Sequence, residues 1–206
     1  LYNAQNECRV RRREMTYCLA IRVNSGLVFA SDSRTNAGVD HVSIYSKMHV
    51  MKPAEDRLFV LLMAGNLATS QAVVNAVKHD LDDPDAEFSL GNAPNLFEAA
   101  DYIGRISTRI QERHAEALKA HNASGEASFI IGGQIGDGPH DVILVYPEGN
   151  CISASPDAPF LQIGETKYGK PILDRIIAPG TLLEDAARCA LVSIDSTMRS
   201  NISVGP

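Results

Sequence analysis

Four residues that can cooperate in amide-bond hydrolysis stand at the ends of short apolar segments: Thr16, Asp32, Lys47 and Gly65. A threonine hydroxyl is a weak nucleophile at neutral pH, so it needs an adjacent base and a positive charge that stabilises the alkoxide as it forms. A lysine ammonium held by a carboxylate supplies that charge. A glycine backbone N–H can donate a hydrogen bond to a tetrahedral oxyanion. These residue types indicate acyl transfer through an ester on the threonine.

The base for this reaction can be the α-amine of Thr16 itself. Met15 stands directly before Thr16, and its removal makes the threonine the N-terminal residue. An α-amine has a pKa of about 7.7–8.0, which suits a general base at neutral pH. We expect residues 1–14 to be upstream sequence or a removable propeptide, and residues 15–206 to form a single domain.

Two hairpins are expected to position these residues. Their strands are predicted over residues 17–23 and 27–34, around an Asn-Ser-Gly turn, and over residues 47–52 and 57–64, around a Pro-Ala-Glu-Asp turn. Cross-strand partners whose numbers sum to about 49 place Asp32 opposite Tyr17. A sum of about 109 in the second hairpin places Lys47 opposite Leu62. The chemistry-bearing residues thus stand at open hairpin ends, and the spacing leaves open whether the two ends meet.

The remaining apolar pattern predicts helices outside stacked sheets. Helices are predicted over residues 66–82, 95–121, 165–178 and 181–199, and further strands over residues 127–133, 141–146 and 150–154. Segregated runs of strands and helices are typical of α+β proteins with antiparallel sheets. Two helical pairs and two sets of hairpins favour sheets stacked in the middle with helices on both outer faces.

Composition and spacing exclude several classes of function. With 206 residues, 45% hydrophobic and 21% charged, the chain is typical of a globular domain, and its net charge of −6 argues against a nucleic-acid partner. The six histidines have no metal-ligand spacing and no glycine loop has a phosphate-binding pattern, so we expect no metal and no cofactor. The four cysteines are widely separated, which suits a reducing, cytoplasmic location. The uncharged stretch between Arg57 and Lys78 is interpreted as a strand, a turn and a helix rather than a membrane span.

Several motifs together resemble proteasome β-type subunits. Met-Thr at 15–16, ASDSRTNAG at 30–38, KMHV at 47–50 and MAGNLATSQ at 63–71 follow the order and spacing of that family. QIGETKYGKP at 162–171 is similar to its bacterial branch, the HslV-related Anbu (ancestral β-subunit) proteins. The resemblance covers residues 15–206. It implies a four-layer αββα sandwich of the N-terminal-nucleophile hydrolase type, acting as a threonine peptidase or amide hydrolase on peptides or unfolded proteins.

The resemblance also implies roles for individual residues. Thr16, after removal of residues 1–15, would be nucleophile and base, Asp32 and Lys47 would be the ion pair that tunes it, and Gly65 would supply the oxyanion N–H. Met63 would floor the substrate pocket, and Arg34 completes the Asp-x-Arg pattern of the family, while Ser203 matches its supporting serine.

Two positions depart from the family pattern. Glu165 stands where the family has the serine of a Gly-Ser-Gly motif, and Ser200 stands where it has an aspartate. The family also continues with further strands after Gly205, so we expect the last strands to be missing here. These departures keep two alternatives open, namely a catalytically idle assembly subunit and a hydrolase of small non-peptide amides.

The resemblance further implies a homo-oligomer, either a ring or a spiral. We expect an antiparallel helical face, such as residues 67–81 or 95–118, to serve as an interface. The sequence identifies no ATPase partner.

Overall fold

The computed structural model describes residues 16–36 and 42–206, so the expected upstream extension (residues 1–14), Met15 and Gly38 lie outside the described residues. The strands are β1 (Tyr17–Val23), β2 (Gly26–Ser31), β3 (Arg34–Asn36), β4 (Val42–Ile44), β5 (Met48–Ala54), β6 (Arg57–Gly65), β7 (Ala127–Ile135), β8 (Asp141–Val145), β9 (Cys151–Ser153) and β10 (Phe160–Gly164). The helices are α1 (Leu67–Asp82), α2 (Leu96–Ala120), α3 (Lys170–Ile176) and α4 (Leu183–Ser200).

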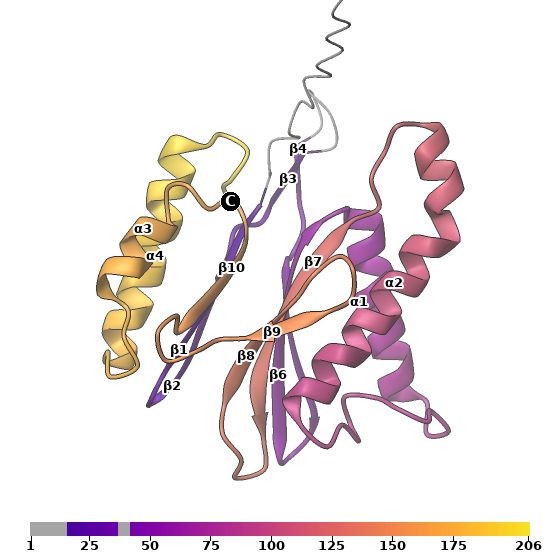
Figure 1. Ribbon diagram of the computed structural model, residues 1–206, viewed down its shortest axis with the longest axis horizontal. Helices are drawn as coiled ribbons and strands as arrows, with labels where there is room; N and C mark the ends of the chain where they lie inside the picture. The colour runs from indigo at the N-terminus through magenta and orange to yellow at the C-terminus, as the bar shows by residue number, and fades with distance from the viewer. Residues whose placement is uncertain (1–15, 37–41) are drawn as a thin grey trace, which may run out of the picture.

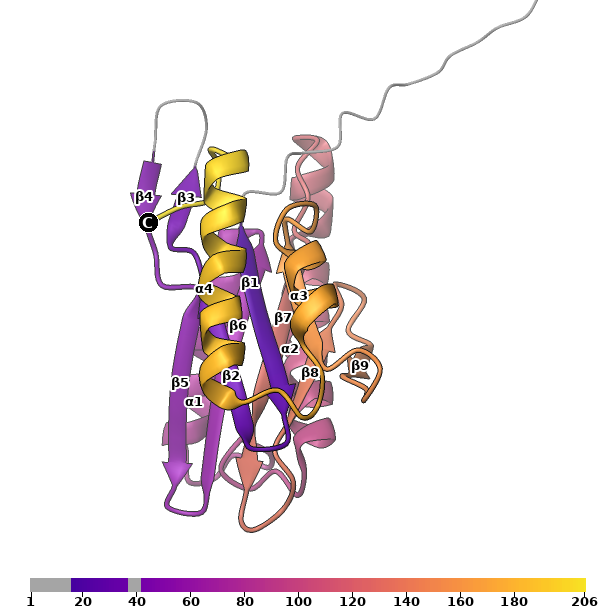
Figure 2. The ribbon, with the colours of Figure 1, turned by 90° about the vertical axis from the view of Figure 1, so that its left-hand side faces the viewer.

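Two antiparallel sheets stack face to face and helices cover both outer faces (Figure 1). One sheet has the order β10-β1-β2 and the other β5-β6-β7-β8-β9, while β3 and β4 form a separate ribbon. Helices α3 and α4 lie on the three-stranded sheet, and α1 and α2 lie on the five-stranded sheet (Figures 1 and 2). The predicted α+β, four-layer αββα architecture is confirmed. No helix in the described part of the chain combines the length and apolar character needed to cross a lipid bilayer.

Three clusters of apolar side chains fill the spaces between the four layers of helices and sheets. The central strands lie between two of these clusters, which explains why they are almost continuously apolar. On β1, Leu19 and Ile21 pack toward α3 and α4, whereas Cys18 and Ala20 pack toward the other sheet. Successive side chains of a strand point to opposite faces, so a strand covered on both faces needs apolar residues at every position. The rigid middle of the molecule therefore carries the ends of β1 and β6, where the candidate residues stand.

Asparagine caps begin the two helices that cover the five-stranded sheet. The Asn66 side chain accepts a hydrogen bond from the Thr69 N–H, and the Asn95 side chain accepts one from the Glu98 N–H. Each cap satisfies an N–H that the first helical turn leaves without an intrahelical partner. The Asn66 cap places the start of α1 directly after the end of β6.

The C-terminal part of the chain differs from the sequence-based expectation. The helix predicted over residues 165–178 extends only from Lys170 to Ile176, with Pro171 in its first turn. Upstream of it, β10 was not predicted, yet it pairs antiparallel with β1 over its full length. Its five residues are too short a run to show a period, so only pairing with β1 reveals it as a strand.

The register of the first hairpin is as predicted, and that of the second differs by one residue. Cys18 faces Ser31 in the first hairpin. In the second, Met48 rather than Lys47 faces Leu62, because the turn falls on Glu55 and Asp56, one residue later than predicted, so that Ala54 pairs with Arg57. The irregularity of the ladder between Met51 and Ala54 takes up only part of that shift. Pro53 lies in that interval and has no N–H for the ladder, which is typical of a bulge.

The layer between the sheets is expected to contribute strongly to stability. We predict that Leu62→Ala, which removes a fully buried side chain from this layer, lowers the free energy of unfolding by about 2–5 kcal/mol. Leu58→Ala is the matched control in the same strand, because Leu58 is 46% exposed, and it should cost less than about 1 kcal/mol. Urea denaturation followed by circular dichroism measures both. Equal losses would contradict the packing described here.

Candidate functional site

The open ends of the two hairpins meet through a buried ion pair. Lys47 Nζ lies 2.8 Å from Asp32 Oδ1, and the two side chains are 5% and 0% exposed. Lys47 Nζ also donates a hydrogen bond of 2.6 Å to the backbone carbonyl of Arg34. The shift in register sets the Lys47 backbone opposite Met63, whose N–H donates to the Lys47 carbonyl at 3.0 Å. The ammonium is therefore fixed from both hairpins.

Asp32 connects this ion pair to the start of β1. The Tyr17 N–H donates to Asp32 Oδ1 at 3.0 Å, and the Asp32 N–H donates to the Tyr17 carbonyl at 3.0 Å. Tyr17 directly follows Thr16, which is itself buried at 8% exposure. The carboxylate that holds the Lys47 ammonium is thus bonded to the residue next to the candidate nucleophile.

Burial and the ion pair act on the Asp32 carboxyl in opposite directions. Burial raises its pKa above the ordinary value of 3.8, and the hydrogen bond and charge of Lys47 lower it, as do the N–H groups of Tyr17 and Gly205. Because loss of water disfavours the charged form, the carboxylate depends on the ammonium to stay ionised.

A cysteine close to the same carboxylate is chemically inert. Burial, followed by the charge of Asp32, raises the pKa of the Cys18 thiol well above its ordinary value. The thiolate is the reactive form of cysteine, so Cys18 does not compete as a nucleophile. Its Sγ instead lies 3.6 Å from the Met63 carbonyl, which links β1 to the end of β6.

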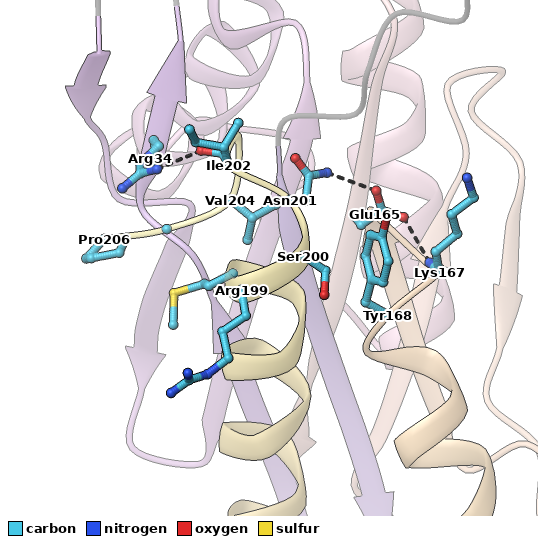
Figure 3. A pocket seen from close by; sticks show the side chains of 12 residues that line it. Arg34, Glu165, Lys167, Tyr168, Arg199, Ser200, Asn201, Ile202, Val204 and Pro206 are labelled. Atoms are coloured by element: carbon cyan, nitrogen blue, oxygen red, sulfur yellow. Dashed lines mark hydrogen bonds between the residues drawn. The ribbon is translucent and has the colours of Figure 1, made fainter.

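Glu165 holds the backbone of Thr16 from the opposite side. The Glu165 N–H donates to the Thr16 carbonyl at 2.8 Å. Its carboxylate accepts hydrogen bonds from the Lys167 N–H and from Asn201 Nδ2, both at 2.9 Å (Figure 3). Gly164, just before it, has φ +87° and leaves no room for a Cβ, which would collide with the Thr16 carbonyl oxygen. Only glycine allows this close approach of β10 to Thr16, the candidate nucleophile.

The segment after α4 contacts the site on both sides, at Glu165 and at the residues around Asp32. Asn201 reaches Glu165, and its Oδ1 also accepts the Ser203 N–H at 3.0 Å. The Gly205 N–H donates to Asp32 Oδ2 at 3.4 Å. The Gly205 carbonyl accepts the Ser33 and Arg34 N–H groups, and Arg34 Nη1 donates to the Ile202 carbonyl at 2.6 Å.

Sequence reasoning assigned no role to Asn201 or Gly205. The available signal was the Asn-x-Ser spacing of Asn201 and Ser203, because an asparagine side chain commonly accepts the N–H two residues later. Ser203 is buried at 8% exposure, while the side chain of Ser200, at the aspartate position of the family, is exposed.

A groove of about 660 Å³ opens beside this segment. Arg34, Glu165, Tyr168, Asn201 and Pro206 are among its lining residues (Figure 3). No group of three or more His, Cys, Asp or Glu side chains within residues 16–36 and 42–206 could hold a metal ion.

Gly65 and Met63 occupy the end of β6. Gly65 is exposed with φ +102°, and a Cβ there would collide with the Glu126 carbonyl oxygen. The glycine thus has a structural cause, and its assignment as oxyanion donor stays a prediction. Met63 is 3% exposed and packs into the layer between the five-stranded sheet and helices α1 and α2. Its assignment to a substrate pocket also stays a prediction.

Comparisons with known proteins give one consistent result. Among solved structures, the chain is similar to the Anbu complex of Pseudomonas aeruginosa, described as a helical assembly (48% identity, 93% of this chain, 78% of that chain, TM-score 0.88). It is also similar to Anbu from Yersinia bercovieri (43% identity, the same coverage, TM-score 0.85) and to an Anbu (Gly-1) mutant from Hyphomicrobium sp. strain MC1 (44% identity, the same coverage, TM-score 0.84).

The matches among sequences are more limited. The chain is 31% identical over 106 residues to the curated protein proteasome subunit beta type-9 of Oryzias latipes. That match spans 52% of this chain and 45% of the length of the relative. A scan against models of protein families found no match.

The ion pair predicts how the stability of a variant without Lys47 depends on pH. Lys47→Met leaves the buried Asp32 carboxylate without its counter-charge, which should lower the free energy of unfolding at pH 7 by about 3–5 kcal/mol. In the variant, burial holds the folded-state pKa of Asp32 above its unfolded value. The contribution of Asp32 to the stability of the variant is then fully present below the pKa of Asp32 in the unfolded chain. It is lost as the pH rises through the pKa of Asp32 in the folded protein. The deficit relative to the wild type should therefore be small near pH 4 and largest at neutral pH.

Urea denaturation of both proteins across this pH range measures the deficit. The double variant Lys47→Met/Asp32→Asn serves as the control, because an uncharged amide needs no counter-charge, and its deficit should not vary with pH. A pH-independent deficit in the single variant would show that Asp32 is not the group responsible.

Proposed function

The chain belongs to the Anbu family of proteasome-like β-subunits, and from this premise we propose that it hydrolyses peptide amide bonds with Thr16 as an N-terminal nucleophile. The observation that carries the proposal is the buried Lys47–Asp32 pair, which the hydrogen bond from the Tyr17 N–H to Asp32 Oδ1 joins to the residue after Thr16. A buried ion pair is weak evidence for stability, because desolvation opposes its attraction. Its place beside a threonine at the start of a strand supports a chemical role.

The reaction begins once the amine of Thr16 is free. The α-amine takes the proton from Thr16 Oγ, and Oγ attacks the substrate carbonyl carbon to form the new C–O bond. The Lys47 ammonium stabilises the alkoxide as its charge develops, and the Gly65 N–H stabilises the oxyanion on the substrate. The α-ammonium then gives its proton to the leaving nitrogen as the C–N bond breaks.

The second half of the reaction repeats these roles with water. The Thr16 α-amine takes a proton from a water molecule, which attacks the ester carbonyl. The ester C–O bond breaks, Thr16 Oγ recovers a proton from the α-ammonium, and the acid product leaves. The other groups around Thr16 position it: Asp32 holds Lys47, Arg34 anchors the strand that carries Asp32, and Ser203 lies on the segment that carries Asn201 to Glu165.

We propose peptides or unfolded proteins as substrates and a homo-oligomer as the working form. The similar P. aeruginosa protein forms a helical assembly, and the chain spans 78% of the length of that relative. A catalytically idle subunit of such an assembly is the second candidate. It is favoured by Glu165, whose carboxylate oxygens both accept hydrogen bonds and which lacks the serine hydroxyl of the Gly-Ser-Gly motif of proteasome β-type subunits.

Covalent labelling tests the proposed nucleophile. A protein that begins at Thr16 is incubated with a peptide epoxyketone, which must react with both the hydroxyl and the α-amine of an N-terminal threonine. Intact-mass and fragment-ion analysis should show one adduct, on Thr16. Thr16→Ala and a chain that keeps residues 1–15 are the controls and should stay unlabelled, because they lack the hydroxyl and the free amine respectively.

A further variant separates the proposed chemistry from reactivity of any N-terminal threonine. Lys47→Ala should lower the labelling rate by about 10²–10³, as expected when a group that stabilises developing charge is removed. Native-like circular dichroism of the variant is the control for folding. A folded protein with a free Thr16 that gains no adduct would favour the idle subunit, and labelling without turnover of a peptide library would favour small amides.

A further inference from the structure

Glu165 stands opposite Thr16 at the end of the three-stranded sheet. The antiparallel register pairs Tyr17 with Gly164, so the next step along both strands brings Thr16 level with Glu165. The hydrogen bond of 2.8 Å from the Glu165 N–H to the Thr16 carbonyl joins these two residues. In an antiparallel ladder the N–H and C=O of one residue point to the same neighbouring strand. The nitrogen of Thr16 therefore points toward Glu165, as its carbonyl does.

The carboxylate of Glu165 is held by two donors that carry no charge. The backbone N–H of Lys167 donates to Oε1, and the side-chain amide of Asn201 donates to Oε2, both at 2.9 Å (Figure 3). These bonds fix the direction of both oxygens on a residue that is half-buried. Because a carboxylate has about four acceptor positions, each oxygen can accept one more hydrogen bond.

Two acidic residues bond to the start of β1, and they differ in how their charge is balanced. Asp32 is paired with the Lys47 ammonium at 2.8 Å. Glu165 forms no ion pair with any residue in the part of the chain that the structure describes. Partial burial disfavours a carboxylate that has no counter-charge. Glu165 is therefore the acid at this site whose charge is still to be balanced.

The cations that line the groove beside Glu165 do not balance it. Arg34 donates to a backbone carbonyl of the segment after α4, and Arg199 lies 2.8 Å from Asp195. The side chain of Lys167 is exposed, and its backbone is the part that bonds to Glu165. A cation that neutralises Glu165 must therefore come from elsewhere.

Cleavage before Thr16 creates such a cation. An α-amine with a pKa of about 7.7–8.0 is mostly protonated at neutral pH, and it arises on the side of Thr16 that points toward Glu165. We propose that the Glu165 carboxylate accepts a hydrogen bond from the α-ammonium group of the cleaved chain and acts as its counter-ion. Asn201 and the Lys167 backbone hold the carboxylate in place for this contact. The inference rests on the proposed function, because it needs the free amine of Thr16.

This counter-ion has two effects on the proposed reaction. It fixes the nitrogen relative to Thr16 Oγ, and it stabilises the protonated amine. Glu165 and Asp32 both raise the pKa of the amine, whereas the Lys47 ammonium lowers it. Since the deprotonated amine is the base, Glu165 moves the onset of activity to higher pH.

A direct measurement of the amine tests the inference without any need for turnover. A chain that begins at Thr16 is acetylated in trace amounts with acetic anhydride over a range of pH. Because only the deprotonated amine reacts, mass analysis of the tryptic peptide of residues 16–22 gives the pKa of the α-amine. Glu165→Gln keeps the size of the side chain and removes its charge. It should lower this pKa by about one unit, which gives about tenfold more free amine at neutral pH.

Three further variants make the test specific. Glu184→Gln is the matched control, because it removes the same charge from an exposed acid in the first turn of α4, about 24 Å along the helix from its last residue. It should leave the pKa of the amine unchanged. Glu165→Asp keeps the charge and should retain most of the raised pKa. Asn201→Ala releases the carboxylate and should lower the pKa by less than Glu165→Gln does, with circular dichroism confirming that each variant is folded.

The pH dependence of labelling by the peptide epoxyketone is the second measurement. The pH of half-maximal labelling rate should fall in Glu165→Gln by the same unit, whereas a merely structural role would lower the rate equally at every pH. An α-amine with the same pKa in the wild type and in Glu165→Gln overturns the inference. A pKa that falls in the variant while neither protein is labelled supports the counter-ion and contradicts the proposed hydrolase, so the two failures are distinguishable.

Discussion

The buried ion pair between Lys47 and Asp32 is the interaction on which the arrangement of the site depends. An ammonium and a carboxylate that leave water lose hydration worth several kcal/mol per ion, and good geometry and further hydrogen bonds must offset that loss. Here the carboxylate also receives the N–H groups of Tyr17 and Gly205, and the ammonium also reaches the Arg34 carbonyl. Apolar residues of similar size could fill the same space, which supports the proposal that the pair provides a positive charge for the chemistry of Thr16.

The fold supplies this pair by bringing three distant segments to one place. The sandwich of two sheets holds the ends of β1 and β6 together, and Cys18 and Met63 join them directly. The segment after α4 then contacts both sides of the site, through Asn201 on Glu165 and through Gly205 on Asp32. Thr16 is thereby held between Glu165 and Asp32, and the short segment after α4 connects these two residues.

The sequence predicts the layers well because they follow from local pattern. Residues buried on both faces make β1 and β6 continuously apolar, and asparagine caps mark the starts of α1 and α2. Strand β10 escapes prediction because its short run of residues becomes a strand only by pairing with β1. The one-residue error in the second hairpin arises at the turn, which falls on Glu55 and Asp56, one residue later than predicted. The irregularity next to Pro53 takes up only part of that shift.

In the candidate site, too, local sequence pattern reveals some residues, and contacts between distant segments reveal the others. Asp32 and Lys47 could be singled out because the predicted hairpins set both at open hairpin ends, and a family resemblance could be recognised around them. Asn201 and Gly205 could not, because their contacts join residues far apart in the chain and Gly205 acts through its backbone.

The central claim is that the Lys47 ammonium is held against the hydroxyl of an N-terminal Thr16. A crystal structure of the assembled protein beginning at Thr16 measures the distance between Lys47 Nζ and Thr16 Oγ. The account predicts a hydrogen bond, with the two atoms within about 3.5 Å. A separation of ten or more Å, roughly three times that limit, with Lys47 still paired to Asp32, would contradict it.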